Sequence, residues 1–356
     1  MPSPNLLREL IMLSILAPVI PVFGIIFIGF FVERLRFLPN GTAFCMNQFV
    51  YWISLPALLF MTMASMEPGQ VSGGHFGGIV VALAVGHLLF YAILSRGFRQ
   101  NGKEVAVWSM LSSFPNCVFM GMPIVALLLP GNQTALVASG LFAIITFVIV
   151  VFTDCQLAIL AGRDSTEAQE GQGSDEGKNN KKDKNSKRQS LPLYIARTLL
   201  HNPLLMSSIL GAICSFIRLH IPMPIATILN MMGATASPCA LFCMGMVLAG
   251  QLQALKGKKA SMPKGWLLRQ VPIHVLKLIV QPILLYVILY LFGVRGVALG
   301  VSVIVMGMPT GVASYIISEK YQVATNDSSL CIVISTMLSL VTITVTIAVL
   351  RTFGIL

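Results

Sequence analysis

Ten apolar stretches, each about as long as a bilayer is thick, constrain what this chain can fold into. A helix needs roughly 20 apolar residues to cross the ~30 Å hydrocarbon core of a membrane. Of the 356 residues, 56% are hydrophobic and only 10% are charged, too few charges to cover a soluble surface. Soluble enzymes, nucleic-acid-binding proteins and disordered chains are therefore excluded. We predict membrane spans at 10–32, 43–64, 76–95, 105–129, 134–160, 198–217, 224–250, 270–292, 296–317 and 329–351.

The predicted fold class is all-α polytopic transmembrane. Membrane β-strands would show as ten-residue segments of alternating hydrophobicity, and no such pattern recurs along the chain. The first apolar stretch is expected to remain as a helix, because it is long for a cleaved signal and no A-x-A-like site follows it.

The basic residues predict how the spans are oriented. With the N-terminus placed outside, 19 of the 24 Lys and Arg residues fall in inner loops and four fall outside. Cytoplasmic loops carry such an excess. We expect a multi-pass protein of the cytoplasmic membrane, with both termini outside.

One polar segment, residues 161–197, divides the chain. It runs from AGRDSTEAQEGQGSDEG into KNNKKDKNSKRQS, and no apolar face can be drawn through it. We predict a disordered cytoplasmic loop that acts as a solvated tether, with a lipid-facing or regulatory basic patch as the alternative. The predicted domains are then 1–160, a first five-helix repeat, and 198–356, a second one.

Matching motifs indicate that the two parts are repeats. NQFVYWISLPALLF begins at Asn47, and NMMGATASPCALF begins at Asn230. The tetrapeptide Met-Gly-Met-Pro occurs at 120–123 in the fourth span and at 306–309 in the ninth. Because five spans is an odd number, the second repeat must enter the membrane inverted, as in many secondary transporters.

The fourth and ninth spans carry the candidate substrate site. A proline inside a helix removes a backbone hydrogen bond, and the freed groups need partners within a membrane. Two paired breaks predict a central polar cavity, where the N-termini of half-helices suit a carboxylate. The alternative is that both prolines merely kink packed helices. The candidate substrate-binding residues are Asn116, Gly121, Pro123, Gly307, Pro309 and Thr310.

The amides in the spans have two interpretations. Asn116, at the break of the fourth span, either holds a substrate carboxylate or bonds to a neighbouring helix. For Asn47, Asn230 and Asn202 we expect a structural polar role.

Two ionisable residues lie inside spans, Asp154 in the fifth and Lys277 in the eighth. Their predicted depths match, so they are candidates for an ion pair that either couples transport or stabilises the fold. Snorkelling of Lys277 to the inner interface is the simpler alternative. His274 lies one turn before Lys277.

We expect no enzymatic activity, no catalytic residues, no cofactor and no metal site. The seven cysteines show no C-x-x-C spacing, and the five histidines form no H-E-x-x-H motif. The sequence contains no P-loop and no G-x-S-x-G motif.

Four motifs resemble the auxin efflux carrier family, which includes plant PIN-type exporters and microbial permeases for malonate and other organic acids. The resemblance spans both halves of the chain and skips 161–197. It is carried by MNQFVYWISLPALLF, SSFPNCVFMGMP, HNPLLMSSILG and MPTGVASYIISEKYQV. The family pattern has an acid early in helix three and a second Asn after the helix-six Asn-Pro. Here 69–95 contains no acid, and the second position is Leu204.

The resemblance implies ten helices that form a scaffold and a transport subdomain, with helices four and nine crossing at Pro123 and Pro309. It also implies contact between Asn116 and a substrate carboxylate, and an elevator-like movement of the crossing. We therefore expect a secondary transporter of a small organic anion, such as a mono- or dicarboxylate. The alternatives are a sodium-coupled symporter of the bile-acid type and a membrane sensor without transport. The expected partners are the carboxylate and the bilayer, with a homodimer left open and no nucleic acid.

Overall fold

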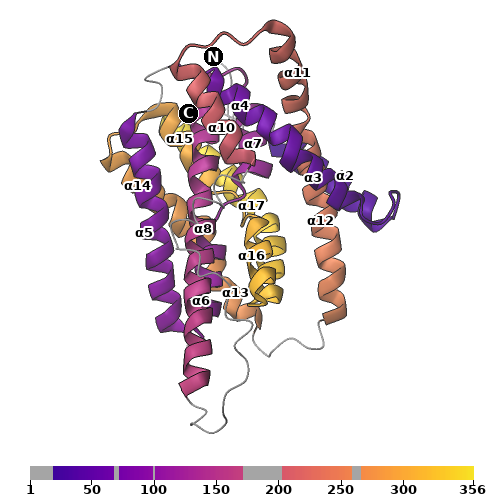
Figure 1. Ribbon diagram of the computed structural model, residues 1–356, viewed down its shortest axis with the longest axis vertical. Coiled ribbons are helices and arrows are strands. Elements are labelled where there is room, and N and C mark those ends of the chain that lie inside the picture. The colour runs from indigo at the N-terminus through magenta and orange to yellow at the C-terminus, as the bar shows by residue number, and fades with distance from the viewer. Residues whose placement is uncertain (1–18, 68–71, 99–100, 171–202, 259–265) are drawn as a thin grey trace, which may run out of the picture.

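The computed structural model describes residues 19–67, 72–98, 101–170, 203–258 and 266–356, and these are almost entirely helical (Figure 1). Within these ranges the β-type pairing is a single isolated bridge. The predicted all-α polytopic membrane fold is confirmed.

The helices follow the predicted spans closely. In chain order they are α2 (Val19–Arg34), α3 (Thr42–Phe49), η1 (Val50–Ser54), α4 (Leu55–Ala64), α5 (Gly73–Gly97), α6 (Gly102–Ser113), η2 (Cys117–Gly121), α7 (Met122–Leu128), α8 (Gln133–Glu170), α10 (Pro203–Phe216), α11 (Met223–Ala234), α12 (Ala236–Lys258), α13 (Trp266–Val275), η4 (Leu276–Val280), α14 (Gln281–Leu291), α15 (Gly296–Met306), α16 (Ala313–Tyr321) and α17 (Thr325–Thr352). Here η marks a π-helical turn.

Six of these helical segments are long and apolar enough to cross a membrane, and three shorter apolar helices accompany them in the described residues. The number of ten spans and the inverted repeat remain predictions. Helix α8 continues to Glu170, ten residues into the segment predicted as a loop. The rest of that loop, like residues 10–18 of the first predicted span, lies outside the described residues.

Each π-helical turn ends two residues before a proline. The prolines are Pro56, Pro123 and Pro282, after η1, η2 and η4 respectively. A proline within a helix has no N–H, and its ring clashes with the carbonyl four residues back. The chain relieves this by widening the preceding turn, so that the N–H of Leu55, for example, bonds to the carbonyl of Val50, five residues back. Such π-turns are frequent at functional sites.

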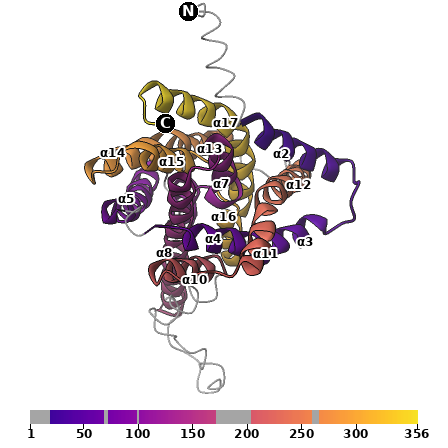
Figure 2. The same cartoon turned by 90° about the horizontal axis from the view of Figure 1, so that it is seen from above.

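The helices form two groups, which Figures 1 and 2 show side by side. One group contains α2, α3, α4, α10, α11 and α12. The other contains α5 to α8 and α13 to α17. Within the first group α2 packs along α12, and α4 packs along α10 and α11. Each group therefore combines spans from both halves of the chain.

Glycines permit the closest packing in the first group. A Cβ added to Gly29 of α2 would overlap the backbone carbonyl of Phe242 in α12. A Cβ on Gly245 of α12 would likewise overlap the carbonyl of Ile26. Small residues allow membrane helices to approach to backbone contact, where dispersion forces are strongest. This contact fixes α2 against α12.

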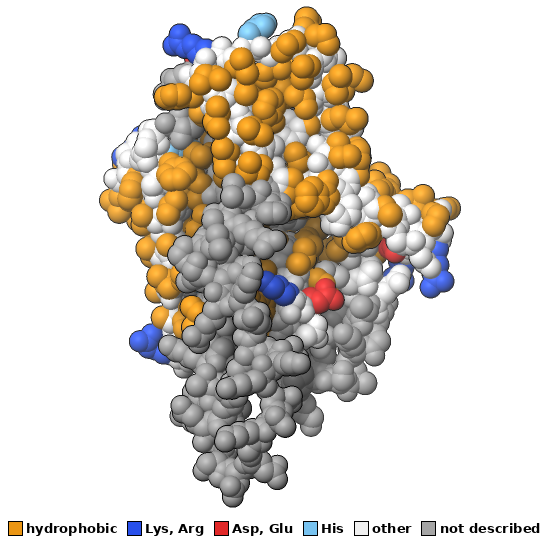
Figure 3. Space-filling model, viewed as in Figure 1, with side chains coloured by type: hydrophobic (Ala, Val, Ile, Leu, Met, Phe, Trp, Pro, Cys, Tyr) orange, Lys and Arg blue, Asp and Glu red, His pale blue; other side chains and the backbone are white. Residues whose placement is uncertain are grey.

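The outer surface of the bundle is apolar. Large hydrophobic side chains on many helices point outward, among them Ile28, Leu88, Ile213 and Val345. Figure 3 shows hydrophobic side chains over most of the described surface on one side of the molecule. Hydrocarbon solvates such a surface, and water does not. The chain is accordingly a multi-pass membrane protein.

Candidate functional site

The fourth and ninth predicted spans are both broken in the middle. Helix α6 ends at Ser113, and the chain runs extended through Phe114 before η2 begins at Cys117. Helix α15 ends at Met306, and α16 begins at Ala313. Pro115 and Pro309 lie in these breaks and cannot donate a backbone hydrogen bond. Each break therefore leaves backbone groups that need partners from elsewhere in the protein.

The two breaks cross, and the backbone groups of one form hydrogen bonds with those of the other. The backbone N–H of Asn116 donates to the carbonyl of Pro309 at 2.7 Å, and that of Gly311 donates to the carbonyl of Phe114 at 3.0 Å. Pro115 and Thr310 form an antiparallel β-bridge between these bonds. An unpaired backbone group costs several kcal/mol in a membrane, so this pairing explains how two spans can be broken at one place.

Thr310 forms hydrogen bonds that join the crossing to α6 and α17. Its hydroxyl donates to the carbonyl of Leu111 at 2.9 Å, and its N–H donates to Ser335 Oγ at 3.1 Å. Thr310 is fully buried. These bonds give it a structural role at the crossing, and its side chain does not line the cavity described below.

The crossing point differs from the one implied by the family resemblance. In the fourth span the chain crosses at Phe114–Asn116, and Pro123 lies seven residues after Asn116 in the first turn of α7. The preceding π-turn, Cys117–Gly121, accommodates this proline within the helix that continues from η2 into α7. Placing the crossing at Pro123 was therefore wrong, whereas Pro309 does lie at the crossing.

A cavity of about 100 Å³ lies beside the crossing, between the two helix groups. A water molecule needs only about 10–15 Å³ by this measure, so the space admits a small organic molecule. The lining is mostly apolar and comes from both groups. It consists of Asn47, Tyr51, Phe114, Pro115, Asn116, Cys117, Val118, Phe119, Phe147, Leu204, Cys243, Met244, Val247, Gly311, Val312, Ala313 and Ile316.

Asn116 is the buried polar side chain of this lining. It is 3% exposed, and its Nδ2 lies 3.8 Å from the sulfur of Met244. A thioether is a weak acceptor, so most of the amide's hydrogen-bonding capacity is left for a ligand. Asn47, from α3 in the other helix group, also lines the cavity. Two amides thus face one space from the two groups.

Two half-helices begin at the same cavity. η2 and α7 together form an apolar helix from Cys117 to Leu128, and its first residues line the cavity. Helix α16 begins there as well, at Ala313. The first N–H groups of a helix lack partners within the helix and carry partial positive charge. Together with the Asn116 amide, they form a set of donors suited to an anion.

The other predicted site residues lie elsewhere. Gly121 packs against Val305 and Met308, where a Cβ would be only 3.2 Å from Val305. Gly307 is the C-cap of α15, next to the crossing but outside the cavity lining. Asn230 is exposed on α11. Asn202 lies outside the described residues.

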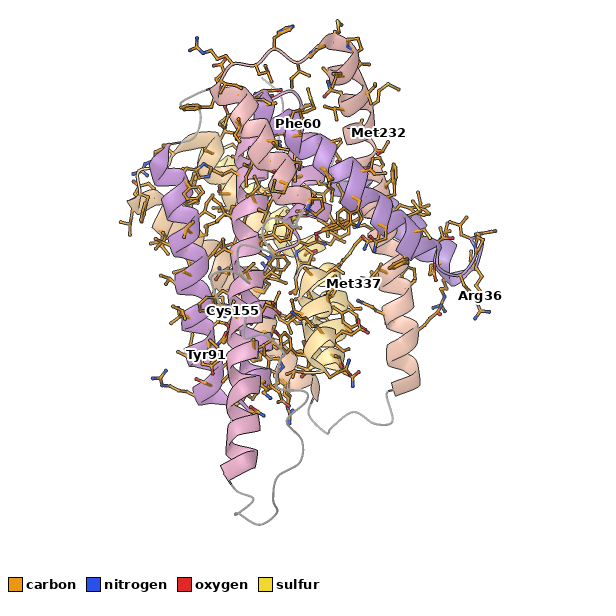
Figure 4. The ribbon with its side chains drawn as sticks, in the orientation of Figure 1. Arg36, Phe60, Tyr91, Cys155, Met232 and Met337 are labelled. Atoms are coloured by element: carbon orange, nitrogen blue, oxygen red, sulfur yellow. The ribbon has the colours of Figure 1, made fainter. Side chains whose placement is uncertain are left out.

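Asp154 and Lys277 do not pair with each other. Asp154 forms an ion pair with Lys320 of α16, at 2.6 Å between Oδ1 and Nζ. Asp154 lies one residue before Cys155, which Figure 4 labels on α8. Lys277 is fully buried, and its Nζ donates to the carbonyl of Met306 at 2.7 Å. The predicted ion pair was wrong, and so was snorkelling, because the ammonium ends inside the bundle.

Sequence reasoning missed most of the cavity lining. Tyr51 follows Asn47 by four residues and therefore lies on the same helix face, a spacing that could have identified it. Phe147, Leu204 and Met244 come from three other helices. Apolar residues within apolar spans carry no local signal that separates a cavity wall from ordinary packing.

Two broken spans that cross beside a small cavity, within a bundle of apolar helices, define the class of α-helical multi-pass membrane transporters. The chain belongs to the membrane transport protein family, whose family model matches residues 14–347. The resemblance to the auxin efflux carriers is thereby confirmed. The chain is also 26% identical over 337 residues to a Rhizobium meliloti (strain 1021) protein named "Putative malonate transporter", covering 94% of this chain and 95% of that protein.

Proposed function

We propose that this transporter carries a small organic anion, a mono- or dicarboxylate, across the cytoplasmic membrane. The observation that carries the proposal is the cavity at the crossing, where the Asn116 amide and the starts of two half-helices meet. Among the described residues, those that line the cavity include no Lys, Arg or His. A carboxylate would therefore be held by amide and backbone N–H donors, as at the helix N-termini that bind anions in other proteins.

The name of the Rhizobium meliloti relative supports this substrate class. Malonate carries two carboxylates and one methylene group. In the cavity one carboxylate would meet the half-helix that begins at Cys117, and the other would meet the half-helix that begins at Ala313. The apolar remainder of the lining suits a ligand with few other polar groups.

The proposed mechanism is alternating access, in which the two helix groups move relative to each other. Because the lining comes from both groups, such a movement would open the cavity to one side and then to the other. The crossing would travel as a unit with α5 to α8 and α13 to α17, while α2 to α4 and α10 to α12 act as the scaffold. In this proposal the two halves of the chain are inverted repeats, and both termini lie outside.

Exchange of a radiolabelled substrate tests the function directly. Purified protein in liposomes loaded with malonate should take up external labelled malonate far faster than empty liposomes do. A panel of mono- and dicarboxylates, competed against the label, would rank the substrates. A membrane sensor would bind the same acids, shown as a rise in thermal unfolding temperature, without any exchange. That outcome would refute transport.

A further inference from the structure

A row of buried polar side chains runs along one face of α13, η4 and α14. Gln270, His274, Lys277 and Gln281 follow each other at spacings of four, three and four, which places them on one helix face. Each is at most 7% exposed. Polar and ionisable side chains cost free energy within a membrane span, so a row of four indicates a functional role.

Most of the buried polar atoms that lack a partner within the described residues lie on this row or on the helix beside it. Five of the eight such side-chain atoms are Gln270 Oε1, His274 Nε2, both amide atoms of Gln281, and Ser328 Oγ of the adjacent α17. Ordered water is the usual partner of such groups inside proteins. Individual water molecules on either side of Lys277 would satisfy these atoms.

Lys277 is held by a backbone carbonyl. Its Nζ donates to Met306, and the ion pair between Lys320 and Asp154 does not include it. The titratable groups near its ammonium include Cys331 of α17 and Cys117 of η2. A buried ammonium without a carboxylate partner is expensive, and its uncharged amine is accordingly an accessible state.

The remaining titratable groups near the row belong to the helices packed against it. Asp327 of α17 accepts from Trp108 Nε1 at 3.1 Å and from Gln270 Nε2 at 3.4 Å, at the end of the row. Helix α6 adds Glu104 and Lys103 in its first turn, and α13 adds Arg269 and His274. None of these is an ion-pair partner of Lys277.

Lys277 and the cavity are both next to the crossing. Met306 is the last residue of α15, directly before the break, and its carbonyl is at the partially negative end of that helix. Cys117 lines the cavity and directly follows Asn116, whose N–H bonds to Pro309, three residues after Met306. A positive charge on Lys277 therefore favours an anion in the cavity.

Building on the proposed function, we propose that Lys277 carries one proton together with each organic anion. The proton enters along the polar row from one face of the membrane and converts the neutral amine to an ammonium, which bonds to Met306. After the two helix groups have moved, the proton leaves to the opposite face and the anion is released to the same face. One positive charge thus crosses with each anion.

By thermodynamic linkage, the effects of proton binding and anion binding on each other are equal. If the charged lysine strengthens anion binding, the bound anion must strengthen proton binding by the same factor. Lys277 lies in a π-turn that directly precedes Pro282 in the helix, and such turns are frequent at functional sites.

The test uses purified full-length protein in liposomes, with the membrane potential clamped at zero by valinomycin and equal K⁺ on both sides. An inward proton gradient of one pH unit should drive about tenfold accumulation of labelled malonate, since one proton moves with each substrate. A pH-sensitive dye inside the liposomes should report one proton entering per malonate. In exchange experiments the KM should rise with pH by up to about tenfold per unit.

Two variants test whether the titration of Lys277 is needed. Lys277→Gln has no titratable group, and Lys277→Arg keeps a permanent charge, so both should lose the proton-driven accumulation and the pH dependence of the KM. Lys103→Gln, outside the row, should behave as the wild type does. Accumulation by either Lys277 variant at the wild-type level would overturn the proposal.

The outcomes for the wild type separate the two proposals. Net malonate uptake without proton entry would overturn the role of Lys277 and leave the proposed transport function intact. Failure to exchange any acid of the panel would overturn both. Slower net uptake by folded Lys277→Arg that still takes in one proton per malonate would show that Lys277 only positions α15, and it would also overturn proton carriage.

Discussion

The backbone N–H of Asn116 donates a 2.7 Å hydrogen bond to the carbonyl of Pro309, joining two residues that are 193 positions apart. The same asparagine directs its side chain into the cavity beside the crossing. One residue therefore fixes the two broken spans to each other through its backbone and presents an amide to the ligand through its side chain. Side-chain substitution can test the second role without removing the first.

Replacing Asn116 by Ala should abolish malonate exchange. The Ala variant keeps the backbone bond to Pro309 but loses the amide, and a lost hydrogen bond to a charged group costs about 1.5–3 kcal/mol, or roughly 10- to 150-fold in binding. Initial rates of exchange in liposomes measure the effect, and gel filtration with thermal unfolding verifies the fold. Asn230→Ala is the matched control, because Asn230 is exposed and does not line the cavity. Wild-type exchange by Asn116→Ala would contradict the assigned site.

A methyl group on Gly311 should disrupt the crossing. An added Cβ would overlap the ring of Phe114, whose carbonyl accepts the Gly311 N–H bond. We expect Gly311→Ala to lose most transport activity and to lower the thermal unfolding temperature, since overpacking a buried site costs about 1–3 kcal/mol. Pro123→Ala should retain exchange, because Pro123 lies in α7, outside both the crossing and the cavity. Equal losses in the two variants would contradict this location of the crossing.

The ion pair between Asp154 and Lys320 should respond asymmetrically to substitution. Asp154 is 6% exposed and Lys320 is 48% exposed. Lys320→Met leaves a buried carboxylate without its charged partner, whereas Asp154→Asn leaves an ammonium that water can reach. We therefore expect Lys320→Met to destabilise more, by about 1–3 kcal/mol, as measured by thermal unfolding in detergent. The double variant should recover part of that loss, and a larger effect of Asp154→Asn alone would contradict the argument.

Two glycines on the same helix should differ in their tolerance of a methyl group. In α2, a Cβ on Gly29 would overlap the backbone of Phe242, whereas a Cβ on Gly24 would meet no atom within 4 Å. Gly29→Ala should separate α2 from α12 and lower the unfolding temperature. Gly24→Ala should be neutral or stabilising by up to about 1 kcal/mol, because alanine favours the helix. Similar unfolding temperatures for the two variants would refute the close packing of α2 on α12.

The apolar patterning of the sequence was enough to predict the fold class and most helix positions. A span must satisfy its backbone hydrogen bonds within itself, so about 20 apolar residues in a row specify a helix without reference to any other part of the chain. The prolines of the fourth and ninth spans likewise indicated paired breaks, and Asn116 was identified at one of them. Helix formation and helix breaks depend on neighbouring residues in the chain, so the sequence is enough to predict them.

The tertiary structure decided the partners. Lys277 bonds to Met306, and Asp154 bonds to Lys320. The predicted depths along the spans had suggested instead that Lys277 and Asp154 would pair. The crossing falls at Phe114–Asn116 because backbone groups of one break face those of the other. Depth is a one-dimensional coordinate, but a contact depends also on which helices are neighbours and which faces they turn to each other. Only the packed bundle determines that.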